Sequence, residues 1–150
     1  MAGWQMGGIL TLQSGSPFNV LQSGDSQNVE FSSWERPNVV AGVSPTLSQR
    51  DAARWFNTSA FSRSLGMFGS SGRDPLTGPT LHTTDLSVSK TFRIPGMESH
   101  QVLFRTEFFN SFNSPQFDVP GGTLGNGTFG VVTGTRSDNR QIQFAMKYMF

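Results

Sequence analysis

The 150-residue chain has no cysteine, only one tyrosine, and a charged fraction of 14 %. The absence of cysteine excludes disulfide bonds and thiolate metal sites. A net charge of +1 gives no reason to expect nucleic acid or another polyanion as a partner. No run of about 18 apolar residues occurs, which excludes a transmembrane helix. The first residues carry neither the basic nor the apolar region of a signal peptide, so none is expected.

Helical periodicity is also scarce, whereas strand-like alternation is frequent. One short helix is predicted over residues 47–56. Four segments alternate apolar and polar residues with a period of two, which is typical of strands. They cover residues 3–13, 84–94, 100–112 and 140–150. These lengths exceed the usual strand of about 5–6 residues, and they suit a tilted strand that crosses a bilayer with about 9–11 residues.

The last eleven residues, RQIQFAMKYMF, show the alternation most clearly. Smaller or polar residues occupy one face, and the other face consists of Ile142, Phe144, Met146, Tyr148 and Phe150. In residues 84–94 the pattern is broken once, at Lys90, which falls among apolar residues. Alternation alone fits a strand that faces lipid, and it fits equally a half-buried edge strand of a soluble sandwich.

The connections between the four segments differ greatly in length. Residues 14–83 separate the first two segments and residues 114–138 the last two, whereas residues 95–99 (PGMES) join the second to the third. Long and short connections in alternation are typical of outer-membrane barrels, which have long outer loops and tight periplasmic turns. A structureless loop of this length does not fit a compact soluble domain. The short turn is therefore predicted to be periplasmic.

The predicted fold class is all-β: an antiparallel up-and-down transmembrane β-barrel fragment with about four C-terminal strands and long outer loops. Barrels of this kind need at least about eight strands. Residues 1–150 are therefore expected to be the C-terminal part of a larger barrel, without a signal peptide. The partners that follow from this fold are outer-membrane lipid and the remaining strands of the barrel.

Several blocks of the sequence resemble the end of a TonB-dependent receptor of the Oar-like branch, whose members carry a carboxypeptidase-regulatory-like domain. The most specific blocks are GRDPLTGPTLHTTDLSVSK and FRTEFFNSFNSPQF, and the similarity runs through the whole chain in order. The resemblance implies a barrel of about 22 strands with an internal plug, an outer-membrane location, and TonB-driven uptake of a bulky ligand. It does not name the ligand. The plug is expected to lie outside residues 1–150 and to be a partner of this part of the barrel.

The C-terminal segment also resembles the signal that the barrel-assembly machinery reads, which makes that machinery an expected partner. Gln143, Tyr148 and Phe150 match the pattern, and Ala145 stands where glycine is usual. This departure keeps the residue small.

Two further groups of residues are candidate sites. Exposed aromatic residues in polar loops often bind ligands, and the candidates for loop ligand contacts are Trp34, Trp55, Phe56 and Phe61, with Phe68 in the same loop. They could equally pack a compact loop. Asp85, Arg105 and Glu107 are predicted to be lumen-facing charges, and an acid–base site is the less favoured interpretation.

We expect no enzyme activity, no cofactor and no metal site. No nucleophile, base and orienting group occur in a catalytic arrangement, and His82 and His100 stand alone rather than among the three or four ligands that zinc needs. Two other functions remain open. One is surface adhesion or secretion without import, and the other is a soluble β domain with an aromatic carbohydrate-binding loop.

Overall fold

The computed structural model describes residues 3–26, 28 and 35–150, apart from the side chain of Glu98. The chain divides into two compact units. The sheet unit comprises Met1–Gln13, Leu81–Gln116 and Ser137–Phe150, and the loop unit comprises Ser14–Thr80 and Phe117–Arg136. Among the described residues the regular structure is β, apart from one 3-10 turn. No helix in this part of the chain is long and apolar enough to span a membrane.

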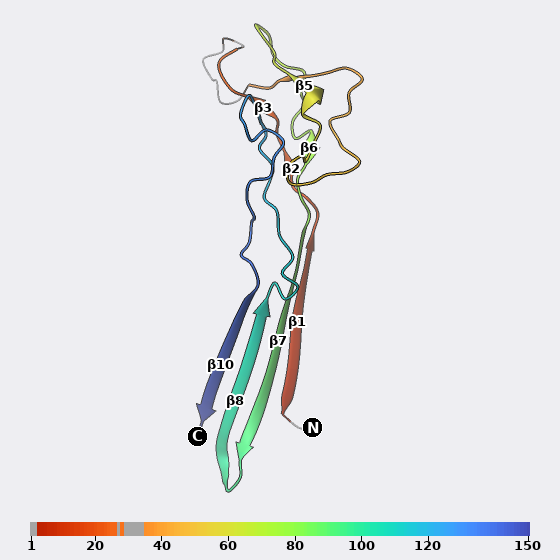
Figure 1. Ribbon diagram of the computed structural model, residues 1–150. Helices are drawn as coiled ribbons and strands as arrows, with labels where there is room; N and C mark the ends of the chain where they lie inside the picture. Colours follow the sequence, from red (N-terminus) through yellow and green to blue (C-terminus); the bar gives the residue numbers. More distant parts are fainter. Residues whose placement is uncertain (1–2, 27, 29–34) are drawn as a thin grey trace. The chain divides into compact units, whose positions relative to one another are not determined.

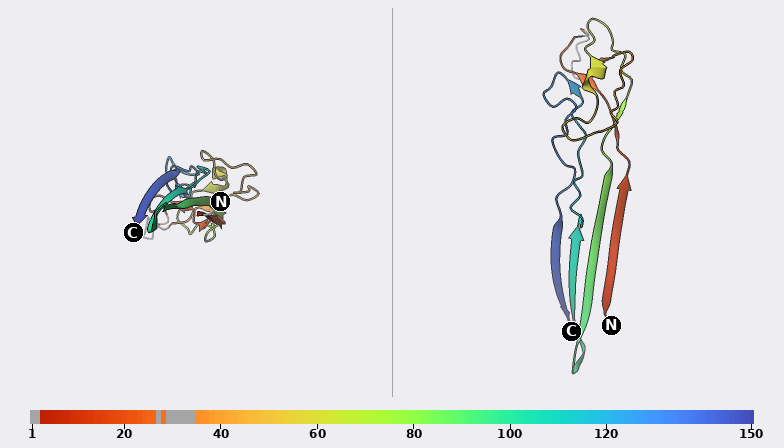
Figure 2. Two further views of the ribbon diagram at one scale, coloured as in Figure 1. Left: turned by 90° about the horizontal axis from the view of Figure 1, so that it is seen from below. Right: turned by 45° about the vertical axis from the view of Figure 1, so that its right-hand side comes forward.

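The sheet unit is a four-stranded antiparallel sheet (Figures 1 and 2). Its strands are β1 (Trp4–Gln13), β7 (Leu81–Ile94), β8 (Met97–Phe109) and β10 (Gln141–Met149). They lie side by side in chain order, each antiparallel to the next. The predicted all-β, antiparallel, up-and-down fold is thus confirmed. Within the described residues the sheet is not closed, and β1 and β10 form its two edges.

The strand bounds differ from the predicted ones around the short turn. β8 begins at Met97, three residues earlier than expected, because the turn consists of Pro95 and Gly96 rather than of residues 95–99. Gly96 has a φ of +81°, a conformation that glycine adopts without steric cost. At its other end β8 stops at Phe109, because Asn110 has a φ of +48° and leaves the extended conformation.

The register determines which strand faces lie on the same side of the sheet. Leu86 on β7 pairs with Gly8 on β1 and with Phe108 on β8, and Phe108 pairs with Ile142 on β10. Paired residues point to the same side. One side, here called the apolar face, therefore collects the apolar positions of all four strands: Trp4, Met6, Leu10, Leu12, Leu86, Val88, Phe92, Val102, Phe104, Phe108, Ile142, Phe144, Met146 and Tyr148.

The opposite side, here called the polar face, carries most of the hydrophilic strand residues. They are Gln5, Thr11, Gln13, Thr83, Asp85, Ser87, Ser89, Thr91, Arg93, Gln101, Arg105, Glu107, Gln141, Gln143 and Lys147. The apolar exceptions on this face are Ile9, Leu81, Leu103, Phe109 and Met149. Most apolar and polar side chains of each strand thus point to opposite sides, and the register places the apolar sides of all four strands on the same face of the sheet.

The loop unit contains short paired segments rather than long strands. β2 (Pro17–Phe18) pairs with β6 (Leu76–Thr77), and β4 (Asn38–Val39) pairs with β5 (Phe61–Ser62), both antiparallel. β3 (Leu21–Gln22) pairs with β9 (Thr123–Leu124) in parallel. The 3-10 turn η1 covers Thr58–Ala60. The stretch that was expected to be a structureless loop is therefore a compact unit.

The loop unit has a hydrophobic core of its own, made of Phe18, Val20, Phe56, Ala60, Phe61 and Leu76. Phe56 lies at its centre, with ring-centroid distances of 5.9 Å to Phe61 and 5.1 Å to Phe129. Both of these pairs have the edge-to-face geometry that aromatic rings prefer. Phe129 belongs to the second long connection, so the two connections form the core together.

The predicted helix over residues 47–56 is wrong. The backbone of this segment makes one local turn, in which Arg54 and Asp51 are hydrogen-bonded through their N–H and carbonyl groups, and its other backbone hydrogen bonds go to a distant part of the loop unit. The N–H of Trp55 donates to the carbonyl oxygen of Gly130 at 2.8 Å, and the carbonyl oxygen of Ala52 accepts from the N–H of Val132 at 2.7 Å. These tertiary bonds outweigh a weak local helix propensity.

Candidate functional site

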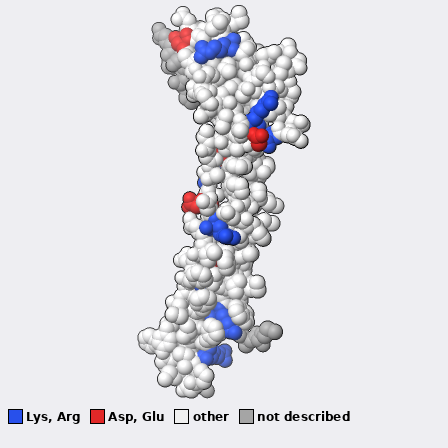
Figure 3. Space-filling model, viewed as in Figure 1, with Lys and Arg blue, Asp and Glu red and all other residues white. Residues whose placement is uncertain are grey.

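The apolar face of the sheet is largely uncovered. Met6 and Met146 are 78 % and 77 % exposed, and Phe144 is 67 % exposed. Burying one such side chain contributes about 1.5–3 kcal/mol, so a continuous face of them in water would be strongly unfavourable. Contiguous apolar patches of this extent mark contact with a membrane or another protein. Charged side chains are sparse on the surface that Figure 3 shows.

Aromatic residues gather on the apolar face near the end that carries the Pro95–Gly96 turn. The hydroxyl of Tyr148 and Nδ1 of His100 form a short hydrogen bond. The Phe150 ring stacks on His100 and on Tyr148, with centroid distances of 6.5 Å and 5.8 Å. Aromatic girdles at the membrane–water interface are typical of outer-membrane barrels. The position of this cluster fits such a girdle at the end with the short turn.

The predicted lumen-facing charges lie together on the polar face. Arg105 donates to Glu107 in an ion pair at 2.6 Å, and these two residues line a shallow hollow together with Asp85. Asp85 is not directly opposite them, because the β7 partners of Arg105 and Glu107 are Ser89 and Ser87. Its carboxylate instead accepts the backbone N–H of Asn110 at 2.9 Å.

Most cross-strand neighbours of the Arg105–Glu107 pair have small side chains. Ser89 and Ala145 are those of Arg105, and Ser87 and Gln143 are those of Glu107. Gly7 also lines the hollow. Because serine, alanine and glycine fill little space, the charged pair remains accessible, and Arg105 keeps half of its side chain exposed. The arrangement can bind polar groups.

The block FFNSFNSPQF ends β8 with a network of side-chain hydrogen bonds that sequence reasoning missed. The side-chain amide of Asn110 donates to the carbonyl oxygen of Ser114 at 3.0 Å and accepts the N–H of Ser114 at 3.0 Å. The side-chain amide of Gln116 likewise donates to the carbonyl oxygen of His82 at 2.5 Å and accepts the N–H of His82 at 2.8 Å. The signal was present as Asn-Ser pairs, since asparagine tolerates positive φ and forms local turns.

The predicted barrel-assembly residues divide between the two faces of β10. Gln143 and Ala145 lie on the polar face, and Tyr148 lies on the apolar face with Phe150 stacked beside it. β10 pairs with β8 along one side and forms an edge of the sheet along the other. The role of these residues in assembly stays a prediction.

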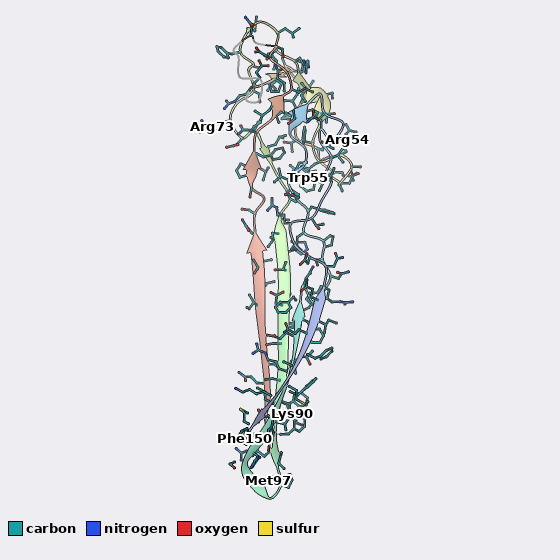
Figure 4. All side chains as sticks on the ribbon, turned by 90° about the vertical axis from the view of Figure 1, so that its left-hand side faces the viewer. Arg54, Trp55, Arg73, Lys90, Met97 and Phe150 are labelled. Carbon is teal, nitrogen blue, oxygen red and sulfur yellow. The ribbon has the colours of Figure 1, made fainter. Side chains whose placement is uncertain are left out.

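The residues predicted as loop ligand contacts differ in their exposure and contacts. Phe56 and Phe61 are 1 % and 5 % exposed, so the interpretation as ligand contacts is wrong for them and packing is their role. Trp55 packs partly against the same core, and its Nε1 donates to the carbonyl oxygen of Thr77 at 3.0 Å. Figure 4 shows Trp55 and Arg54 within the loop unit. Trp34 lies outside the described residues.

Phe68 was among the aromatic residues predicted from the sequence as possible ligand contacts, whereas its exposed apolar neighbours Leu65 and Met67 were not. Leu65, Met67 and Phe68 are 66–80 % exposed and follow one another on a turn. Both ends of the turn are fixed, since Ser64 is fully buried and a Cβ on Gly69 would lie 2.0 Å from the carbonyl oxygen of Arg36. No group of three or more His, Cys, Asp or Glu residues that could hold a metal ion occurs in the described part of the chain.

These observations define a class of protein. Long antiparallel strands with one apolar and one polar face, a tight turn at one end and long connections at the other are the features of a β-barrel that crosses the outer membrane. The chain matches the model of the outer membrane beta barrel domain over residues 1–143, and it belongs to that family. No curated protein and no solved structure matches the chain. Its location is the outer membrane of a Gram-negative bacterium.

Proposed function

We propose that the chain forms part of the barrel of an Oar-like TonB-dependent receptor, which takes up a bulky ligand across the outer membrane. In this proposal the sheet unit pairs with the remaining strands of the barrel around a plug. The polar face lines the lumen, and the connections between strands make the first contact with the ligand. The chain itself performs no catalysis and holds no cofactor.

The observation that carries the proposal is the folded state of the two long connections. Residues 14–80 and 117–136 build a joint core around Phe56 instead of short, featureless loops. Ordering so many residues costs conformational entropy, and a barrel that served only as an anchor would not need it. The fixed turn with Leu65, Met67 and Phe68 offers an apolar contact surface for a ligand.

Surface adhesion or secretion is the competing function, and the contact with TonB separates it from uptake. An epitope is inserted at Gly127, where a side chain would meet open space, in the chromosomal gene of the host. Cells are treated with formaldehyde, and adducts that contain both the epitope and TonB are sought in outer-membrane fractions. A TonB that lacks its periplasmic C-terminal domain serves as the control.

The proposal predicts an adduct with intact TonB and none with the truncated form. An epitope-bearing barrel that reaches the outer membrane at normal abundance without any TonB adduct would instead support adhesion or secretion. If the epitope prevents the barrel from reaching the outer membrane, the epitope will be absent from the outer-membrane fraction. This outcome is therefore distinguished from a barrel that is present but does not contact TonB.

A further inference from the structure

Lys90 is the irregular residue of the apolar face. It lies on β7 and pairs with Trp4 on β1 and with Phe104 on β8, both of which belong to that face. Among the strand residues whose side chains the structure describes, it is the one Lys, Arg, Asp or Glu on this side of the sheet. The other lysine of the chain, Lys147, lies on the polar face.

The ammonium group of Lys90 lies between two aromatic rings. Nζ is 4.6 Å from the centroid of the Trp4 ring and 5.0 Å from that of the Phe92 ring. Phe92 is two residues nearer to the Pro95–Gly96 turn, so the side chain leans toward that end of the sheet. Figure 4 shows Lys90, Phe150 and Met97 near this end. Lysines on membrane proteins extend in this way to bring the charge to the interface.

No carboxylate of the described residues neutralises this charge. Asp85 and Glu107 lie on the polar face, and neither ion pair in the described part of the chain involves Lys90. The two rings contact one side of the ammonium group by cation–π interactions, and N–H donors on its other side can bind an acceptor. A cation within the hydrocarbon is costly, so the ammonium group extends to the interface, where water and lipid phosphates can accept its hydrogen bonds.

We propose that Lys90, Trp4 and Phe92 form a binding site for the phosphate of an anionic glycerophospholipid in the periplasmic leaflet. The leaflet follows from the short turn, which is periplasmic in barrels of this kind. The depth of Lys90 in the membrane follows from the aromatic girdle. Tyr148 of the girdle is in register with Val102 and Phe92, and Phe92 is two residues from Lys90 toward the turn. The phosphate accepts hydrogen bonds from Nζ, and the rings contact the glycerol and the first acyl carbons.

The test uses the intact outer-membrane protein that carries this chain, reconstituted in vesicles of phosphatidylcholine and phosphatidylglycerol in equal amounts. Native mass spectrometry then counts the lipids that stay bound after release in mild detergent. The protein is expected to retain phosphatidylglycerol in preference to phosphatidylcholine. Lys90→Met, which suits an apolar face, is expected to reduce the phosphatidylglycerol-bound fraction relative to the lipid-free fraction about fivefold, the effect of one lysine near an anionic surface.

Two variants complete the design. Lys90→Arg keeps the charge and is expected to restore retention, whereas Lys147→Met removes the lysine of the polar face and is expected to leave retention unchanged. Equal retention of phosphatidylglycerol by the parent protein and Lys90→Met would overturn the proposal. So would displacement of the bound lipid by millimolar inorganic phosphate, which would identify a site for soluble anions. Neither result depends on TonB, so this test is separate from that of the uptake function.

Discussion

At the residue scale, neighbouring positions on one strand have opposite environments. Val88 lies on the apolar face and pairs with Met6 and Thr106, whereas Ser87 lies on the polar face and pairs with Gly7 and Glu107. The alternation along β7 was readable from the sequence, because successive strand residues point to opposite sides. The identity of their neighbours was not, because Met6 and Thr106 are remote in the chain.

Charge substitutions at these two positions should therefore have unequal effects. Val88→Arg places a charge near the middle of a lipid-facing strand, which costs about 2–4 kcal/mol of stability in such barrels. Ser87→Arg places the same charge beside Gly7 and opposite Glu107, and a change within about 0.5 kcal/mol is expected. The free energy of unfolding of the intact barrel in urea, measured for both variants in lipid vesicles, checks the difference. Equal destabilisation would mean that the two faces do not differ in environment.

Aromatic residues illustrate what a sequence leaves open at this scale. Phe56 and Phe68 both lie in the first long connection, yet the first is 1 % and the second 80 % exposed. The difference arises from long-range contacts, since Phe56 packs against Phe18 and Phe129. Composition and local pattern carry no information on such contacts.

At the element scale, the ends of strands were harder to predict than their middles. β7 begins at Leu81, although the predicted alternation starts only at residue 84. The side-chain amide of Gln116 bonds to both the N–H and the carbonyl oxygen of His82, as a neighbouring strand would. This contact orders the start of β7, and it comes from a residue far along the chain.

The loop unit is the element whose order was least expected, and its core makes that order testable. Phe56→Ala should cost about 3–5 kcal/mol, because it removes a buried ring and leaves a cavity. Phe68→Ala removes an exposed ring from the same unit and should leave stability nearly unchanged. Hydrogen exchange of the backbone amides of Trp55 and Val132 in the intact protein reports the opening of this unit alone. Fast exchange in both variants, or in neither, would contradict the assignment of Phe56 to a structural core.

At the scale of the whole molecule, the sequence was sufficient for the class of fold. Period-two alternation over long segments and the unequal connections both pointed to an outer-membrane barrel, and family membership over residues 1–143 confirms it. The sequence did not show whether the apolar faces of the four strands lie on the same side of the sheet. The register was needed for this, because a strand after a long connection can shift by one residue without any change in its sequence pattern. The compact loop unit required tertiary contacts that no local pattern encodes.

The four strands present unpaired edges at β1 and β10 in the described residues, and no water is available in hydrocarbon to bond with exposed N–H and carbonyl groups. The sheet is therefore stable in a bilayer only when further strands complete a closed barrel. Contact with hydrocarbon also requires an apolar outer band, which accounts for the alternation, and the thickness of the bilayer accounts for the strand length.

The central claim is that the apolar face meets lipid, and β10 allows the most direct test because the chain contains no cysteine. Single cysteines from Gln141 to Met149, spin-labelled in the intact protein in vesicles, report collision with oxygen, which concentrates in hydrocarbon, and with a water-soluble nickel complex. The account predicts that oxygen collisions peak at Ile142, Phe144, Met146 and Tyr148 and that nickel collisions peak at the residues between them. Equal accessibility at successive positions, or apolar positions shielded from both reagents, would contradict it.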